Sequence, residues 1–220
     1  MAFKSLSQPR LRLADQVYEQ IMAAIRAGDI SAQDRIVQEK LAEQFEISRT
    51  PVREALFRME QEGILEVAGH GGFRIRQLDL AEIRELYGSR CAIEAYAARL
   101  LASNGSKAIY DSLRETISKA EDLRNDSVEA YFMANYQIHR AIVEASENRY
   151  LLEFSENIWN RGSSFTVFST IRSVDLAKSL GGHMALIDAI ETKDGSIAAA
   201  AMIDHINEGL ELQIASGQWE

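Results

Sequence analysis

Three of the four histidines in this chain lie in apolar segments of its second half. His139, His183 and His205 each have apolar residues three, four or seven positions away, so each imidazole should face the interior of a helical bundle. Imidazole suits zinc, nickel, copper or iron, and three such nitrogens leave positions open for water or a ligand carboxylate. Asn135 lies one helical turn before His139 and completes the candidate metal site.

Two other interpretations of these histidines stay open at this point. Each imidazole can be an isolated core residue whose ring nitrogens are satisfied by near neighbours. A small metal-dependent hydrolase would use the same three side chains. Such an enzyme usually has an acidic general base, and the sequence contains no HExxH, GxSxG or GxxxxGKS motif.

A second candidate site lies in the segment EKLAEQFEISRTPVREALFRMEQEGIL. Its first part has apolar residues at helical spacing as far as Phe45, and Thr50 followed by Pro51 favours the start of a new helix. Arg49 and Arg53 share one face of that helix, and an apolar stripe occupies another: Val52, Ala55, Leu56 and Met59. This is the layout of a helix-turn-helix and predicts DNA binding, although plain helix packing with solvated arginines gives the same spacing.

A hairpin should follow the second of these helices. Gly63 stops the helix, and short strands are expected at 64–67 and 73–76 around a glycine-rich turn at 68–72. Such a hairpin forms a wing that is placed to touch the phosphate backbone or a minor groove of DNA.

The run SRTPVREAL, with EGIL and HGGF downstream, closely resembles the winged helix of GntR-family transcription regulators over about residues 16–76. The resemblance implies that Arg35 and Arg49 contact phosphates, that Thr50 and Arg53 lie near bases or backbone, and that the wing tip touches DNA. The DNA-binding residues implied in this way are Arg35, Ser48, Arg49, Thr50, Arg53, His70 and Gly71.

Phe57 departs from the pattern of that family, which commonly carries a polar or basic residue at this position. The ring of Phe57 either packs under the wing or touches a thymine methyl group. Packing is the expectation, because exposed aromatic side chains usually find protein first.

The net charge of −9 is an objection to DNA binding, since DNA repels acidic proteins. The acidic excess, however, lies entirely in the second half of the chain. Residues 1–77 carry eleven basic and eleven acidic side chains, whereas residues 78–220 carry 13 basic and 22 acidic ones. The first part can therefore present a basic face to DNA, with Arg10 and Arg12 on a flexible arm.

Several features of the sequence indicate a cytoplasmic protein with no membrane partner. Cys91 is the single cysteine and cannot form an internal disulfide, and no basic-then-apolar leader opens the chain. The longest uncharged apolar run, 197–203, is too short to span a bilayer.

Long helical periodicity replaces strands and turns after Gln77, so a domain boundary is expected there. We predict a mainly α fold, with a winged helix-turn-helix domain at 1–77 and an all-helical antiparallel bundle of about six helices at 78–220. The bundle would sense a ligand and hold a dimer together. Its helices are expected at 80–103, 106–124, 127–145, 149–168, 175–192 and 195–216.

The second half resembles the FCD effector domain of FadR-type regulators, in its shorter, VanR-like version. Many such domains bind a metal through a D-x-x-x-H pair and two later histidines, which correspond here to Asn135, His139, His183 and His205. The resemblance implies a divalent transition metal, with zinc or nickel expected. Because Asn135 replaces an aspartate, the site loses one negative charge and metal affinity should fall.

The resemblance also implies that the effector is a small carboxylate neutralised by a basic side chain. Arg90 matches a pocket-facing arginine of the family, although it could instead form a helix-surface pair with Glu94. Arg161 is a second candidate for effector binding. The predicted function is thus a homodimeric repressor that leaves a palindromic operator when the effector binds; the alternative is a regulator whose helical domain holds no metal.

Overall fold

A computed structural model of the chain describes residues 9–27, 29–69, 71–122, 128–160 and 181–216. The chain divides into two compact units, which we name unit 1 (Met1–Gln77) and unit 2 (Leu78–Glu220). Helices make up most of the described residues, and the one sheet found among them has two strands. The predicted mainly α fold, with a winged helix-turn-helix followed by a helical bundle, is confirmed.

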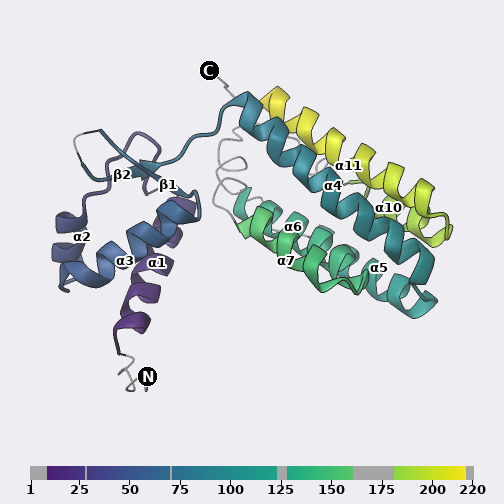
Figure 1. Cartoon of the computed structure of the whole chain (residues 1–220), viewed down its shortest axis with the longest axis horizontal. Helices are drawn as coiled ribbons and strands as arrows, with labels where there is room; N and C mark the ends of the chain where they lie inside the picture. The colour runs from purple at the N-terminus through teal and green to yellow at the C-terminus, as the bar shows by residue number, and fades with distance from the viewer. Residues whose placement is uncertain (1–8, 28, 70, 123–127, 161–180, 217–220) are drawn as a thin grey trace, which may run out of the picture. The chain divides into compact units, whose positions relative to one another are not determined.

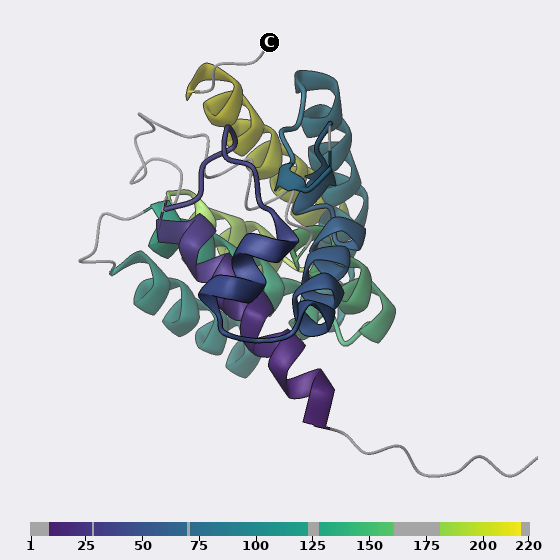
Figure 2. The ribbon, with the colours of Figure 1, turned by 90° about the vertical axis from the view of Figure 1, so that its left-hand side faces the viewer.

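Unit 1 contains three helices: α1 (Pro9–Ala27), α2 (Gln38–Gln44) and α3 (Arg49–Gln61). Helices α1 and α2 both lie against α3 (Figure 1, Figure 2). The prediction that Arg10 and Arg12 lie on a flexible arm is wrong, because both residues belong to α1. Val17, Ile21 and Ile25 of α1 are buried at a spacing of four residues, and this amphipathic stripe explains why the segment is helical.

A tight turn joins α2 to α3. The backbone N–H of Ile47 donates to the Ala42 carbonyl at 3.0 Å, and Glu46 takes a positive φ of 54°. Helix α3 begins at Arg49 with Ser48 as its N-cap, slightly earlier than the start expected near Thr50. Pro51 still lies in the first turn, where a backbone N–H has no acceptor within the helix.

The wing consists of β1 (Leu65–Val67) and β2 (Phe73–Ile75), paired antiparallel with Leu65 opposite Ile75. Gly71 and Gly72 close the turn with φ angles of 85° and 87°, a region that suits glycine. A Cβ on Gly72 would lie 2.8 Å from the Ile36 carbonyl oxygen, so only glycine fits here. The expected strands are confirmed, each shorter by one residue.

Unit 2 is built around two long helices, α4 (Leu80–Asn104) and α11 (Gly195–Ser216), which lie side by side and antiparallel (Figure 1). A capping box at Asp79 and Glu82 fixes the start of α4. The remaining described helices pack around this pair: α5 (Lys107–Glu121), α6 (Val128–Ala145), α7 (Arg149–Asn160) and α10 (His183–Glu191).

Most of the predicted helices of unit 2 agree with the structure within a few residues. Two differ. Helix α7 ends at Asn160 in the described part, and the rest of the predicted 149–168 lies outside the described residues. Helix α10 begins only at His183, because Gly182 before it has a φ of 92° that breaks the helix. Among the described residues, no helix is long and apolar enough to cross a membrane.

Candidate functional sites

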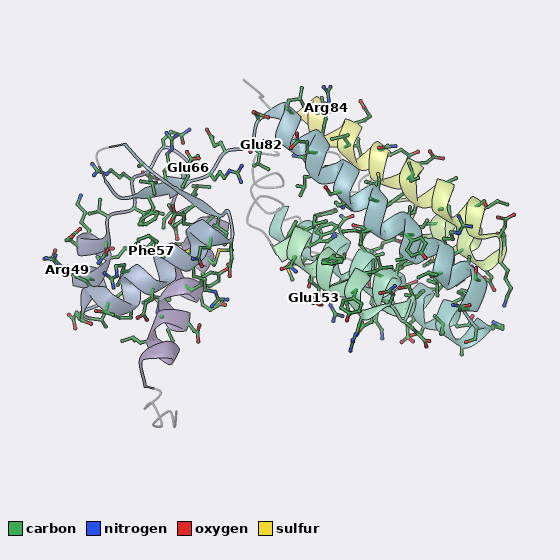
Figure 3. The ribbon with its side chains drawn as sticks, viewed as in Figure 1. Arg49, Phe57, Glu66, Glu82, Arg84 and Glu153 are labelled. Carbon is green, nitrogen blue, oxygen red and sulfur yellow. The ribbon has the colours of Figure 1, made fainter. Side chains whose placement is uncertain are left out.

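The exposed ridge of α3 carries the first candidate site. Arg49, Arg53 and Phe57 follow one another at four-residue intervals and are all exposed, while the opposite face of α3 is buried. Ser48 and Thr50 are exposed at the start of the same helix. Arg49 projects from the start of α3 (Figure 3), where unpaired backbone N–H groups also favour an anion.

Arg49 has an acidic neighbour on α2. Its Nη1 lies 3.4 Å from Glu39 Oε1, and the two side chains are 69% and 56% exposed. Exposed ion pairs of this kind contribute little stability, so Arg49 can exchange Glu39 for a phosphate at small cost.

Arg35 supports the wing in the structure. Its Nε donates to the Gly71 carbonyl at 2.6 Å, and Gly71 itself is exposed at the wing tip. This bond holds the wing turn near the start of α2, which is a role that the sequence did not indicate. His70, the other wing-tip residue predicted to bind DNA, lies outside the described residues.

The three histidines of unit 2 come together from three helices: α6 supplies His139, α10 supplies His183 and α11 supplies His205. One ring nitrogen from each lies within 4.8 Å of the others. Two nitrogens on one ion lie at most about 4.2 Å apart, given metal–nitrogen distances of about 2.1 Å. Small side-chain rotations therefore suffice for all three to bind one ion, and the set fits a divalent transition metal.

Burial keeps two of these rings neutral. It lowers the pKa of His139 to about 4 by disfavouring the imidazolium, against the opposing effect of Glu94. It also lowers the pKa of His205 to about 2, and the neighbouring His139 and His183 lower it further. Neutral imidazoles offer lone pairs, so the cluster is prepared for a cation.

A buried carboxylate orients His139. Glu94 Oε2 lies 2.5 Å from His139 Nδ1, and both side chains are 1% exposed. Burial would raise the pKa of Glu94, but the charge of Arg90 and the hydrogen bond with His139 hold it well below its usual range. Glu94 is therefore an acceptor, so His139 carries its proton on Nδ1 and presents Nε2 to the cluster.

His183 has a similar neighbour. Its Nδ1 lies 3.5 Å from Glu121 Oε1 at the end of α5. Carboxylates beside metal-binding histidines fix the ring orientation and make the imidazole a stronger ligand. Asn135 is buried, and its amide nitrogen donates to the Tyr131 carbonyl at 3.2 Å. The amide oxygen is the atom of this side chain that has lone pairs, so it is the atom that the predicted metal site would use.

Arg90 lies inside unit 2, so the alternative of a pair with Glu94 on the helix surface is wrong. It is only 6% exposed, and its Nε donates to Glu94 Oε1 at 3.0 Å. The guanidinium carbon lies 4.2 Å from the Trp159 ring centre and 5.0 Å from that of Tyr87. The predicted pair with Glu94 is present, but it is buried and joins the histidine cluster.

Both units match known families. Residues 13–75 match the family described as bacterial regulatory proteins, gntR family, and residues 85–208 match the FCD domain. The chain belongs to the GntR family. Its two units are the GntR DNA-binding domain and the FCD domain, and both predicted resemblances are confirmed.

Full-length relatives agree with this assignment. The chain is 30% identical over 200 residues to the "probable D-xylose utilization operon transcriptional repressor" of Paenarthrobacter nicotinovorans, covering 90% of this chain and 87% of that protein. The solved structure of Escherichia coli McbR/YncC matches with a TM-score of 0.71 at 23% identity, over 96% of this chain and 99% of that one.

A GntR regulator from Rhodococcus sp. RHA1 matches with a TM-score of 0.74 at 16% identity, over 96% of this chain and 100% of that one. Because the matched family consists of transcription regulators and the relative at 30% identity is named as one, the hydrolase interpretation is set aside.

Two residues near the histidine cluster were missed from the sequence, Glu121 and Trp159, and Glu94 was expected only as a possible surface partner of Arg90. Trp159 Nε1 donates to Glu94 Oε1 at 3.1 Å, although the two residues are 65 positions apart. The one available signal was an acidic residue four positions after Arg90 in an alanine-rich segment. Arg161, the second predicted effector ligand, lies outside the described residues.

Proposed function

We propose that this GntR regulator binds an operator through α3 and the wing, and that its FCD domain senses a small carboxylate at a metal held by the histidine cluster. The observation that carries the sensing proposal is the convergence of three histidine nitrogens within 4.8 Å, from three separate helices. Isolated core histidines would have no reason to meet at one point.

The metal ligands in this proposal are the ring nitrogens of His139, His183 and His205 and the amide oxygen of Asn135. The donor set suits a divalent transition metal such as zinc or nickel, which when bound would offer open positions to a carboxylate. Glu94, buried beside His139, supplies a negative charge close to the cluster. This charge partly compensates for the aspartate that Asn135 replaces.

Arg90 is the residue we assign to the effector carboxylate. Its Nε is bound to Glu94, and a guanidinium has further N–H donors that can form a second, charge-assisted pair. Arg90 would thus connect an effector to Glu94 and, through it, to His139.

DNA binding is assigned to Arg49, Thr50 and Arg53 on α3, with Ser48 at its start and Arg35, His70 and Gly71 at the wing. We propose a homodimer on a palindromic operator, because two symmetric copies of α3 match two half-sites. We propose that the protein is a repressor and that binding of the effector releases it from DNA. A relative named as an operon repressor supports it.

The DNA part is tested by gel-shift titration of the full-length protein on DNA selected from a random library. Arg49→Ala and Arg53→Ala should each weaken binding by about tenfold or more, as expected for a lost charge-assisted contact. Arg84→Ala is the matched control, since Arg84 is an exposed arginine of unit 2 (Figure 3). Equal binding by all variants would overturn the assignment of α3.

The sensing part is tested by elemental analysis of untagged protein. We expect close to one zinc or nickel per chain, lost in His183→Ala and retained in the control variant His70→Ala. Metal-free protein whose melting temperature does not change with chelator would favour the alternative, a helical domain without metal.

A further inference from the structure

Phe57 holds an unusual position on the proposed DNA-binding helix. It continues the ridge of Arg49 and Arg53, four residues beyond Arg53. A helix rises about 1.5 Å per residue, so Phe57 lies about 6 Å beyond Arg53 along α3.

The ring of Phe57 packs on the wing but stays partly exposed. It packs edge-on against Phe73 of β2, with 5.9 Å between ring centres and 84° between ring planes. Phe73 is itself held by two backbone hydrogen bonds to Ile36, at 2.7 and 2.8 Å. Phe57 nevertheless remains 49% exposed, and Figure 3 shows it between α3 and the wing.

The exposure of Phe57 distinguishes a residue that only stabilises the wing from one that also contacts DNA. A side chain that only stabilised the wing would be expected to lose most of its exposed surface, as Phe73 has at 8%. Phe57 instead keeps half of its surface open on the face that carries Arg49 and Arg53. The packing on Phe73 reduces the freedom of the ring, so binding through its open side would cost little further side-chain entropy.

The chemistry of the ring limits what it can recognise. Phenylalanine has no donor or acceptor for a base edge or a phosphate. The apolar group that the major groove offers is the 5-methyl group of thymine, and aromatic side chains are suitable partners for it. The two arginines would supply the charge that holds the groove against this apolar surface.

We infer that Phe57 is a specificity-determining residue that recognises a thymine methyl group in each operator half-site. The inference rests on the proposed DNA-binding role of α3. A methyl contact requires a thymine at one point of each half-site.

The test begins with DNA selected from a random library by the full-length protein. Each thymine of one half-site is then replaced in turn by deoxyuridine, which removes only the methyl group. At one position the wild-type protein should bind about fourfold more weakly, the effect expected for one buried methyl group. Phe57→Ala should lose this dependence and bind thymine and deoxyuridine DNA equally well.

Two further variants keep the result interpretable. Phe57→Arg should also lose the methyl dependence but bind DNA with a steeper salt dependence, which shows that the protein is folded and on the DNA. Val67→Ala removes another exposed apolar side chain of the wing and should keep the dependence. The inference is overturned if wild-type binding ignores every methyl group, or if Phe57→Ala keeps the fourfold effect. Absence of any DNA selection would instead count against the proposed function itself.

Discussion

Glu94 contacts three other buried side chains of unit 2. It accepts hydrogen bonds from Arg90 and Trp159 on one oxygen and pairs with His139 through the other. A buried carboxylate without such donors would be costly, and three partners make it tolerable. The same three contacts orient His139, so one side chain links the guanidinium, the indole and the candidate metal ligand.

Replacing Glu94 should therefore weaken metal binding. In Glu94→Gln the charge is lost, the pull on the His139 Nδ1 proton is weaker, and metal affinity should fall about 10–100-fold. Competition titration of zinc against a chromophoric chelator measures this change. Glu153→Gln, at an exposed glutamate of α7 (Figure 3), is the matched control and should bind as the wild type does. Equal zinc affinity of Glu94→Gln and Glu153→Gln would show that Glu94 does not position His139 for the metal.

At the scale of helices and strands, the start of α10 determines how two histidines meet. Gly182 caps α10 with a φ of 92°, and His183 is the first residue of the helix. A Cβ on Gly182 would lie 3.4 Å from His205 Nδ1. The left-handed glycine thus lets α10 begin directly beside α11, which brings His183 and His205 to 4.4 Å between ring centres.

Gly182→Ala should destabilise unit 2 and the cluster together. An alanine in this left-handed conformation costs about 1 kcal/mol or more, and its methyl group would lie in van der Waals contact with the His205 ring. Gly88→Ala is the control, because Gly88 is an exposed residue of α4 with nothing within 4 Å of an added Cβ. That variant should instead stabilise the helix by about 0.5–1 kcal/mol. Thermal unfolding with and without zinc measures the stability of both variants. Equal changes in melting temperature for Gly182→Ala and Gly88→Ala would show that the left-handed conformation of Gly182 does not matter.

These elements also show which features could be predicted from the sequence. The helix positions and the inward faces of the histidines follow from local periodicity, and the buried face of α3 does too. The contacts of Glu94 with His139 and Trp159 were missed because these partners are 45 and 65 positions away in the sequence. Periodicity also cannot distinguish a buried Arg90–Glu94 pair from a surface pair, because both have the same four-residue spacing. Phe57 was expected to pack, and it does so with only half of its surface.

At the scale of the whole molecule, the two units divide the charge and the chemistry. The acidic excess lies in unit 2, together with the histidine cluster and both tryptophans, Trp159 and Trp219. Tryptophan fluorescence therefore reports on unit 2 alone. This separation allows the protonation of the cluster to be followed in the intact chain.

Without metal, unit 2 should lose stability in mild acid. The pKa of His139 is about 4 in the folded state because burial disfavours its charge, but it returns to near 6.5 on unfolding. The unfolded chain then binds more protons, so the free energy of unfolding falls as the pH drops from 6.5 toward 4. His139 alone contributes a loss of about 2 kcal/mol between pH 6.5 and 5.

Urea unfolding followed by tryptophan fluorescence, with chelator present, measures this loss. Protonation of Glu94 adds to it only below about pH 4.5, the ordinary pKa of a glutamate, so measurements at pH 7 and 5 isolate the histidines. His139→Gln should reduce the difference between the two pH values, whereas His70→Ala, in unit 1, should keep it. Zinc should stabilise the wild type more at pH 7 than at pH 5, because protons compete for the same ring nitrogens. A chelated protein that is equally stable at pH 7 and 5 would show that these histidines are not held neutral by burial.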